Sequence, residues 1–241
     1  MLLGCSKEPE AVVIDVTGAS SAAASSAPTQ YDGATTDGTS VSNGTPKVQV
    51  RDTAAYAFNG AKGPVLYGAV AYENTGTAPL TITEASFTFS FNNSTEEVNF
   101  TPIFAKNTIV PPGETAYAAL WYAKPDVEPG TTVSLSASLK CEASDQSSIP
   151  IAVSNIHLAH NYPGFTTMTG AITPESDCPC NLVYAAFYGA DEKFIGVWYF
   201  TENAQLIANE PKVFTSHMKE FPLADLAEQT AEIRAYAIGM S

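Results

Sequence analysis

Three cysteines, Cys141, Cys178 and Cys180, could form a disulfide bond. If the C-terminal part of the chain is a β-sandwich, its first strand starts near Ile149 at the end that faces the preceding residues. The Cys178-Pro179-Cys180 turn then returns to that same end, beside Cys141. We therefore predict a disulfide from Cys141 to Cys178 or Cys180, which requires Cα atoms within about 7 Å of each other. Free thiols, or a strained Cys178 to Cys180 pair, are the alternatives.

Zinc binding is the other chemistry that these residue types suggest, with His157 and His160 joining Cys178 and Cys180 as ligands. The expected strand order argues against it. The two histidines lie toward the opposite turn, about 11 residues of strand from the cysteines, or roughly 35 Å at about 3.3 Å per residue. His217 has no similar neighbour. We therefore predict no metal site and no cofactor.

Two aromatic runs could bind a ligand by stacking: Trp121 stands in a Leu-Trp-Tyr run and Trp198 in a Val-Trp-Tyr-Phe run. Because side chains alternate along a strand, Trp198 and Phe200 share one face and Tyr199 lies on the other. One of the two faces must fill the core, and a second apolar face is usually covered by a neighbouring loop or domain. Trp121 and Trp198 are the candidate stacking residues, with a sugar or a peptide as ligand.

The charge of the chain excludes one class of partner. Its 241 residues include 11 Lys and Arg against 25 Asp and Glu, a formal net charge of -14. This surface repels phosphate backbones, and no basic cluster offsets it locally, so a nucleic-acid partner is excluded. The enzyme signatures G-x-S-x-G, H-E-x-x-H and the P-loop are also missing from the sequence, which predicts a protein that is not an enzyme.

Strands must position these side chains. From Lys47 onward, short β-branched and aromatic runs are separated by Pro, Gly, Asn and Asp about every 8 to 12 residues, a spacing typical of a β-sandwich or barrel. The run 181–188 is apolar on both faces, which predicts a central strand with little exposure.

The two parts of this β region also match each other. Residues 68–75 align with 170–177, and 132–137 align with 232–237, at offsets of 102 and 100 residues. A period near 100 residues indicates tandem domains rather than a solenoid. We predict one sandwich over 47–142 and a second over 148–241, with the boundary in the polar run between them.

The second of these regions resembles a known family. Gly170-x-Ile-x-x-Glu-Ser, Leu182-x-Tyr-x-Ala-Phe187-Tyr188 and a late Ala231-Glu-Ile-x-x-Tyr236 are similar to the FxLYD domain, although Gly189 replaces its usual acidic residue. The resemblance implies an immunoglobulin-like sandwich in an extracytoplasmic protein, and it transfers no catalytic residues. The expected fold class is all-β: two tandem immunoglobulin-like β-sandwich domains after a disordered N-terminal tether.

The start of the chain resembles a bacterial lipoprotein. Met1-Leu-Leu-Gly-Cys5 is similar to the end of a lipoprotein signal peptide, whose cysteine thiol accepts the lipid. Only four residues precede Cys5, so we expect the basic and apolar regions of a signal peptide to lie upstream. Residues 6–46 form the expected flexible tether: 23 of the 29 residues in 18–46 are Gly, Ala, Ser, Thr or Pro.

Together these features predict a lipid-anchored module on the extracytoplasmic face of the bacterial cell membrane. The expected role is a non-enzymatic protein-binding or spacer module of the cell envelope, with a cell-surface protein or glycan as partner. The alternative is an accessory protein that binds a small ligand, carbohydrate or ion through an exposed aromatic face. The exposure of Trp121 and Trp198 separates the two, because a fully buried pair would remove the stacking surface.

Overall fold

The computed structural model describes residues 13–15, 44–144, 149–161, 165–178, 180–202 and 205–240. These residues form antiparallel sheets with two short helices, which confirms the all-β sandwich fold class. The predicted anchor Cys5 and most of the predicted tether lie outside the described residues. Among the residues that are described, no helix is long and apolar enough to cross a membrane.

Six strands and one helix make up the first half of the structure. They are β2 (Val48–Gly60), β3 (Gly63–Asn74), β4 (Leu80–Phe91), β5 (Ser94–Phe100), α1 (Ile103–Asn107), β6 (Thr115–Ala123) and β7 (Ser134–Ala143). The strands form two three-stranded sheets, in the orders β2-β3-β6 and β5-β4-β7.

The second half contains β8 (Ile149–Asn161), β9 (Phe165–Pro174), β10 (Cys180–Tyr188), β11 (Phe194–Glu202), β12 (Lys212–His217), α2 (Leu226–Gln229) and β13 (Glu232–Met240). Its strands follow the order β11-β10-β13-β8-β9-β12, and the short β1 (Val13–Asp15) pairs with β8.

Both halves repeat the same strand order. The β2-β3-β6 sheet corresponds to β8-β9-β12, and the β5-β4-β7 sheet corresponds to β11-β10-β13. In the second half the two groups are joined because β8 pairs with β13 through its first residues and with β9 along the rest of its length. The register of β8 shifts between Ser154 and His157, and Asn155 has a φ of 53° there. This irregularity has the form of a β-bulge within the pairing of β8 with β9.

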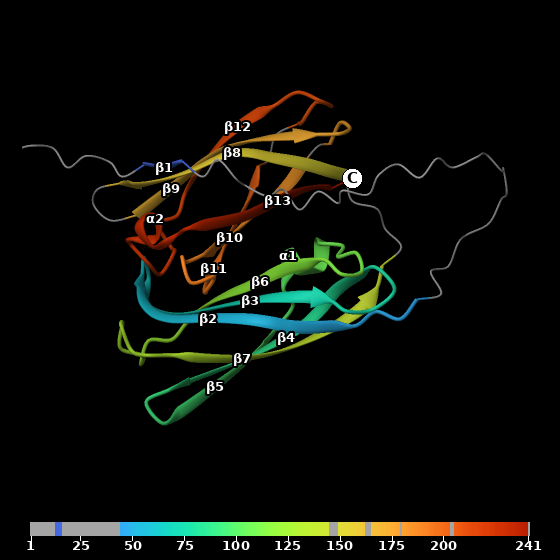
Figure 1. Ribbon diagram of the computed structural model, residues 1–241. Coiled ribbons are helices and arrows are strands. Elements are labelled where there is room, and N and C mark those ends of the chain that lie inside the picture. The colour runs from blue at the N-terminus through green and yellow to red at the C-terminus, as the bar shows by residue number, and fades with distance from the viewer. Residues whose placement is uncertain are drawn as a thin grey trace, which may run out of the picture.

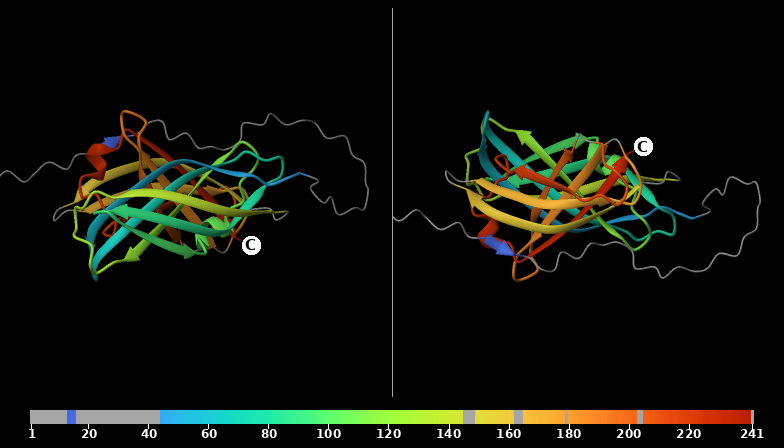
Figure 2. Two further views of the ribbon diagram at one scale, coloured as in Figure 1. Left: turned by 90° about the horizontal axis from the view of Figure 1, so that it is seen from below. Right: turned by 90° about the horizontal axis from the view of Figure 1, so that it is seen from above.

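The two halves stack face to face, so that the molecule has four layers. Figure 1 shows β4, β5 and β7 at one side, then β2, β3 and β6, then β10 and β11, and finally β8, β9 and β12. The views through the layers in Figure 2 show the halves covering each other over most of their length. The two inner sheets therefore lie between apolar surfaces on both sides.

Burial along β3 follows from this stacking. Leu66, Val70 and Tyr72 face the outer sheet of the first half, where they join its sandwich core. The alternate residues Tyr67 and Ala69 face the second half and join a core that both halves share. In the second half, β10 is a strand of the inner sheet. It is central, between β11 and β13, and every residue from 182 to 188 is buried, as its two apolar faces predicted.

The outer strand β4 shows the opposite pattern, with one apolar and one polar face. Phe87 and Phe89 are fully buried in the sandwich core, while the intervening Ser86 and Thr88 are half-buried and point outward. A sheet with one face in solvent requires this alternation. The polar face of β4 thus marks the outside of the molecule.

Candidate functional site

The two tryptophans meet at the junction of the two halves. Trp121 lies on β6 and Trp198 on β11, and their ring centroids are 5.8 Å apart with the rings at 87°. Tyr199 adds a third ring, 5.3 Å from Trp121 and at 88° to it. All three are half-buried and pack against the core that the halves share. The tertiary structure thus brings together two stacking candidates from separate halves, and neither of them is fully buried.

Hydrogen bonds hold both indoles in place. Trp121 Nε1 donates to the backbone oxygen of Glu220 at 2.8 Å. Trp198 Nε1 donates to Ser216 Oγ, also at 2.8 Å. Each buried N–H therefore has a protein partner, as amphipathic rings usually do at an interface.

An open pocket of about 240 Å³ lies beside these rings. Its lining residues come from both halves: Val65, Trp121, Trp198, Tyr199 and Glu220. Sequence reasoning identified the tryptophans but missed Val65 and Glu220. Glu220 lies in the loop between β12 and α2, where no periodicity marks it, and only the docking of the halves brings it to the pocket.

Another pocket, of about 310 Å³, is also lined by Trp121 and Tyr199. Most of its lining is apolar, and it extends toward the loop that leads into α1. Its lining residues are Phe100, Thr101, Pro102, Ala105, Ala118, Ala119, Leu120, Trp121, Tyr184 and Tyr199. We call the two pockets together the aromatic cleft.

Tyrosine hydroxyls from the first half form hydrogen bonds with the backbone of the edge strand β11. Tyr67 Oη accepts the backbone N–H of Val197 and donates to its carbonyl, both at 2.8 Å. Tyr56 Oη donates to the carbonyl of Ile195 at 3.0 Å. An edge strand has unpaired backbone groups, and these hydroxyls satisfy them where no further strand could pair. The walls of the cleft are therefore fixed relative to each other.

Burial raises the pKa values of these phenols. Burial in the shared core raises the pKa of Tyr67 well above its ordinary value. It likewise raises the pKa of Tyr199 to about 12. Tyrosine is already neutral near pH 7, and desolvation of the phenolate keeps both side chains neutral further into the alkaline range.

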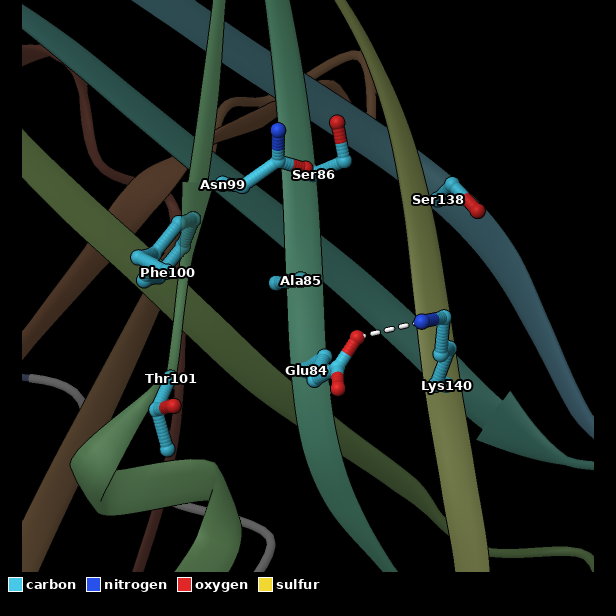
Figure 3. Close-up of a pocket in the computed structure, with 8 residues that line it drawn as sticks. All are labelled: Glu84, Ala85, Ser86, Asn99, Phe100, Thr101, Ser138 and Lys140. Atoms are coloured by element: carbon cyan, nitrogen blue, oxygen red, sulfur yellow. Dashed lines mark hydrogen bonds and ion pairs between the residues drawn. The ribbon is translucent and has the colours of Figure 1, made fainter.

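A third pocket, of about 420 Å³, lies on the outer face of the β5-β4-β7 sheet. Figure 3 shows its lining: Asn99, Ser86 and Ser138 form a row across the three strands, and Glu84 forms an ion pair with Lys140. Polar and apolar side chains share the lining of this pocket, and its one carboxylate is neutralised by that lysine. The sequence signal for this face was the alternation of Ser and Thr with apolar residues along β4 and β7.

The predicted disulfide of Cys141 is not formed, because Cys141 is a free thiol. The strand order did place Cys178 beside Ile149, at the end expected from the sequence, where it is buried against Gly239. Cys141, however, points into the sandwich core of the first half and pairs with Ile82 in the outer sheet. The prediction was wrong because it ignored the alternation along β7. Of Cys180, the structure describes the backbone, which pairs with Met240.

The three histidines lie on β8 and β12, the two strands that flank β9 in the second half. His157 pairs with Thr169 on β9, and the ring of His160 lies 2.7 Å from the backbone oxygen of Ala224 through Nδ1. His217 is on β12, with Nδ1 3.2 Å from Thr167 Oγ1. Among the described residues, no group of three or more His, Cys, Asp or Glu side chains could hold a metal ion.

No protein-family model and no curated protein matches this chain. Solved structures that resemble it include the C-terminal globular domain of an oligosaccharyltransferase from Pyrococcus abyssi, with 9% identity and a TM-score of 0.19. The match covers 79% of this chain and 48% of that chain, so this chain spans about half the length of its structural neighbour. A similarity at this level supports no conclusion about function, and the FxLYD resemblance stays a prediction.

Proposed function

We propose that this chain is a non-enzymatic extracytoplasmic binding module, and that the aromatic cleft between its halves holds a small ligand. One observation carries the proposal: Trp121 and Trp198, from opposite halves, are half-buried and border an open pocket of about 240 Å³. Concave, largely apolar pockets with few polar groups are the usual form of small-ligand sites. The half-exposed tryptophans favour this function over the protein-binding or spacer role that was the first expectation from the sequence.

The lining of this pocket supports binding rather than catalysis. Its ionisable groups are the Glu220 carboxylate and the Tyr199 phenol, whose pKa is raised by burial to about 12. General acid–base catalysis works best with groups that exchange protons near the working pH, and Tyr199 does not. Glu220 alone provides charge for recognition, without a partner for proton transfer.

The rigidity of the junction supports the same function. Tyr56 and Tyr67 fix β11 against the first half through three hydrogen bonds. A site whose walls are held before the ligand arrives loses less conformational entropy on binding. The cleft is therefore preorganised.

Binding can be tested through the fluorescence of the tryptophans. We expect at least one member of a panel of monosaccharides, amino acids and quaternary ammonium salts to change the tryptophan emission of the full chain in a saturable way. The reason is that both tryptophans of the sequence border the cleft. A panel that leaves the emission unchanged at millimolar concentrations would contradict the proposal.

The location follows from the proposed lipid on Cys5. In cells that carry the gene, we expect the natural protein in the membrane fraction and the Cys5→Ala variant in the soluble fraction, because the acyl chains supply the affinity for the membrane. Immunoblots of the two fractions measure this. A Cys141→Ala variant is the matched control and should stay with the membrane. If Cys5→Ala also stays there, Cys5 is not the anchor.

A protein-binding or spacer role is the second candidate, favoured by the outer face of the β5-β4-β7 sheet. Short hydroxyl side chains cross this face, such as Thr88 and Ser136 in one register and Thr95, Ser90 and Ser134 in the next. Short side chains lose little entropy when a flat surface covers them. Crosslinking in native cells that enriches a surface protein or glycan over the Cys5→Ala control, with no ligand from the panel, would favour this candidate.

A further inference from the structure

We propose that the pocket formed by Val65, Trp121, Trp198, Tyr199 and Glu220 binds a quaternary ammonium group. This inference rests on the ligand-binding function proposed for the aromatic cleft and names the chemical class of the ligand. It is carried by three features of the pocket: the angles between its rings, the hydrogen bonds already made by its indoles, and a single carboxylate that forms no ion pair within the described residues.

The rings form a corner rather than a flat platform. Trp121 stands at 87° to Trp198 and at 88° to Tyr199, with centroids 5.8 and 5.3 Å away. A sugar stacks best on one open, flat ring face. A compact, round cation can instead lie against several rings at once, and the negative faces of Trp and Tyr attract it. The geometry therefore suits a trimethylammonium group.

Both indoles have already used their donors within the protein. Trp121 Nε1 is bonded to the Glu220 carbonyl and Trp198 Nε1 to Ser216 Oγ. A sugar in this pocket would bring hydroxyl groups that lose water without gaining indole donors, which costs free energy. The methyl groups of a quaternary ammonium need no hydrogen-bond partner, so this ligand avoids that cost.

Glu220 brings the one formal negative charge to the lining of this pocket. Its carboxylate accepts the backbone N–H of Ala61, with distances of 3.3 and 3.4 Å. Within the part of the chain that the structure describes, it forms no ion pair with lysine, arginine or histidine. The preceding residue, Lys219, places its ammonium over the Phe165 ring instead, 5.3 Å from the centroid. The net charge of -14 also raises the local concentration of cations.

Titration of the full chain with four probes tests this inference. The probes are tetramethylammonium chloride, choline chloride, the neutral carbon analogue 3,3-dimethyl-1-butanol, and sodium chloride as the control for ionic strength. Tryptophan emission reports on the pocket directly, since Trp121 and Trp198 are the two tryptophans of the chain. We expect saturable binding of both ammonium salts in the millimolar range, and binding of the neutral analogue that is weaker by about tenfold.

A pair of variants tests the carboxylate. Glu220→Gln keeps the shape of the side chain and an oxygen that accepts the Ala61 N–H, but it removes the charge. We expect it to weaken choline binding by about threefold to tenfold. Glu142→Gln removes the same charge from the exposed end of β7 and should leave choline binding unchanged.

The outcomes distinguish a failure of this inference from a failure of the proposed ligand-binding function. Equal binding of choline and its neutral analogue would overturn the assignment of a cation while supporting an apolar ligand in the cleft. Binding of a sugar or amino acid from the wider panel, without binding of either ammonium salt, would also overturn it. If no compound changes the emission, both this inference and the proposed function fail.

Discussion

Raising the pH above about 10 is expected to unfold this protein steeply. Burial raises the pKa of six tyrosines that lie in or beside the shared core: Tyr56, Tyr67, Tyr117, Tyr184, Tyr188 and Tyr199. In the unfolded chain these phenols ionise near pH 10, while in the folded chain they keep their protons to higher pH. The folded state therefore binds more protons than the unfolded state above about pH 10, so its stability falls as the pH rises.

The free energy of unfolding falls with pH at a rate set by the number of these tyrosines. Each tyrosine that ionises only in the unfolded state lowers the free energy of unfolding by about 1.4 kcal/mol per pH unit. Stability should be constant with respect to these groups below about pH 10 and should fall by several kcal/mol toward about pH 12. Melting temperatures measured across this range by circular dichroism, together with tyrosinate absorbance, would show both events occurring together.

Tyr67→Phe is the matched variant for the alkaline transition. It removes one titrating group together with the bonds to Val197. We expect a loss of about 1 to 3 kcal/mol at neutral pH, because two buried backbone groups lose their partner. The dependence of stability on pH should become shallower. If the tyrosines of the natural protein ionise near pH 10 while the circular dichroism stays native, the phenols are not protected by the fold.

Gly196→Ala is expected to destabilise the protein by about 3 kcal/mol and to loosen the junction of the halves. Gly196 has a φ of 152°, and a Cβ placed there would lie 2.8 Å from Tyr67 Oη and 3.2 Å from the Phe221 ring. The Tyr67 hydroxyl cannot move away without breaking its two bonds to Val197. The methyl group thus acts on the hydrogen bonds that hold β11. Urea unfolding of the two proteins measures the difference.

Gly113→Ala is the control for backbone strain alone. Gly113 also has a positive φ, 83°, but a Cβ there would meet nothing within 4 Å. This variant should lose about 1 kcal/mol from conformational strain. If the two variants lose the same stability, contact with Tyr67 is not what makes Gly196 necessary.

The face-to-face packing of the halves explains why the inner strands are apolar on both sides. Tyr67 and Ala69 on β3, and Tyr117 on β6, would lie on the solvent side of an isolated sandwich, yet all three are buried in the shared core. This burial makes the junction part of the hydrophobic core rather than a contact between two separate surfaces. The aromatic cleft lies at the margin of this junction, where the packing leaves Trp121 and Trp198 half-buried.

Sequence patterns predicted what depends on neighbouring residues in one strand. The two apolar faces of β10 and the two aromatic runs could be predicted, because the side chains of a strand point to opposite faces with a period of two. The repeated segments at 68–75 and 170–177 fall on β3 and β9, which hold the same position in the two halves.

Tertiary structure alone decided which surfaces meet. An apolar second face on a strand shows that something covers it, but the partner surface is selected by shape and apolar area summed over many residues. For this reason the sequence could mark Trp121 and Trp198 as stacking candidates yet could not place them 5.8 Å apart, beside Glu220. The Cys141 disulfide failed for a related reason: the correct end of the sandwich was inferred, but Cys141 faces the core of the first half. The residue types were set by the sequence, and the site was made by the docking of its two halves.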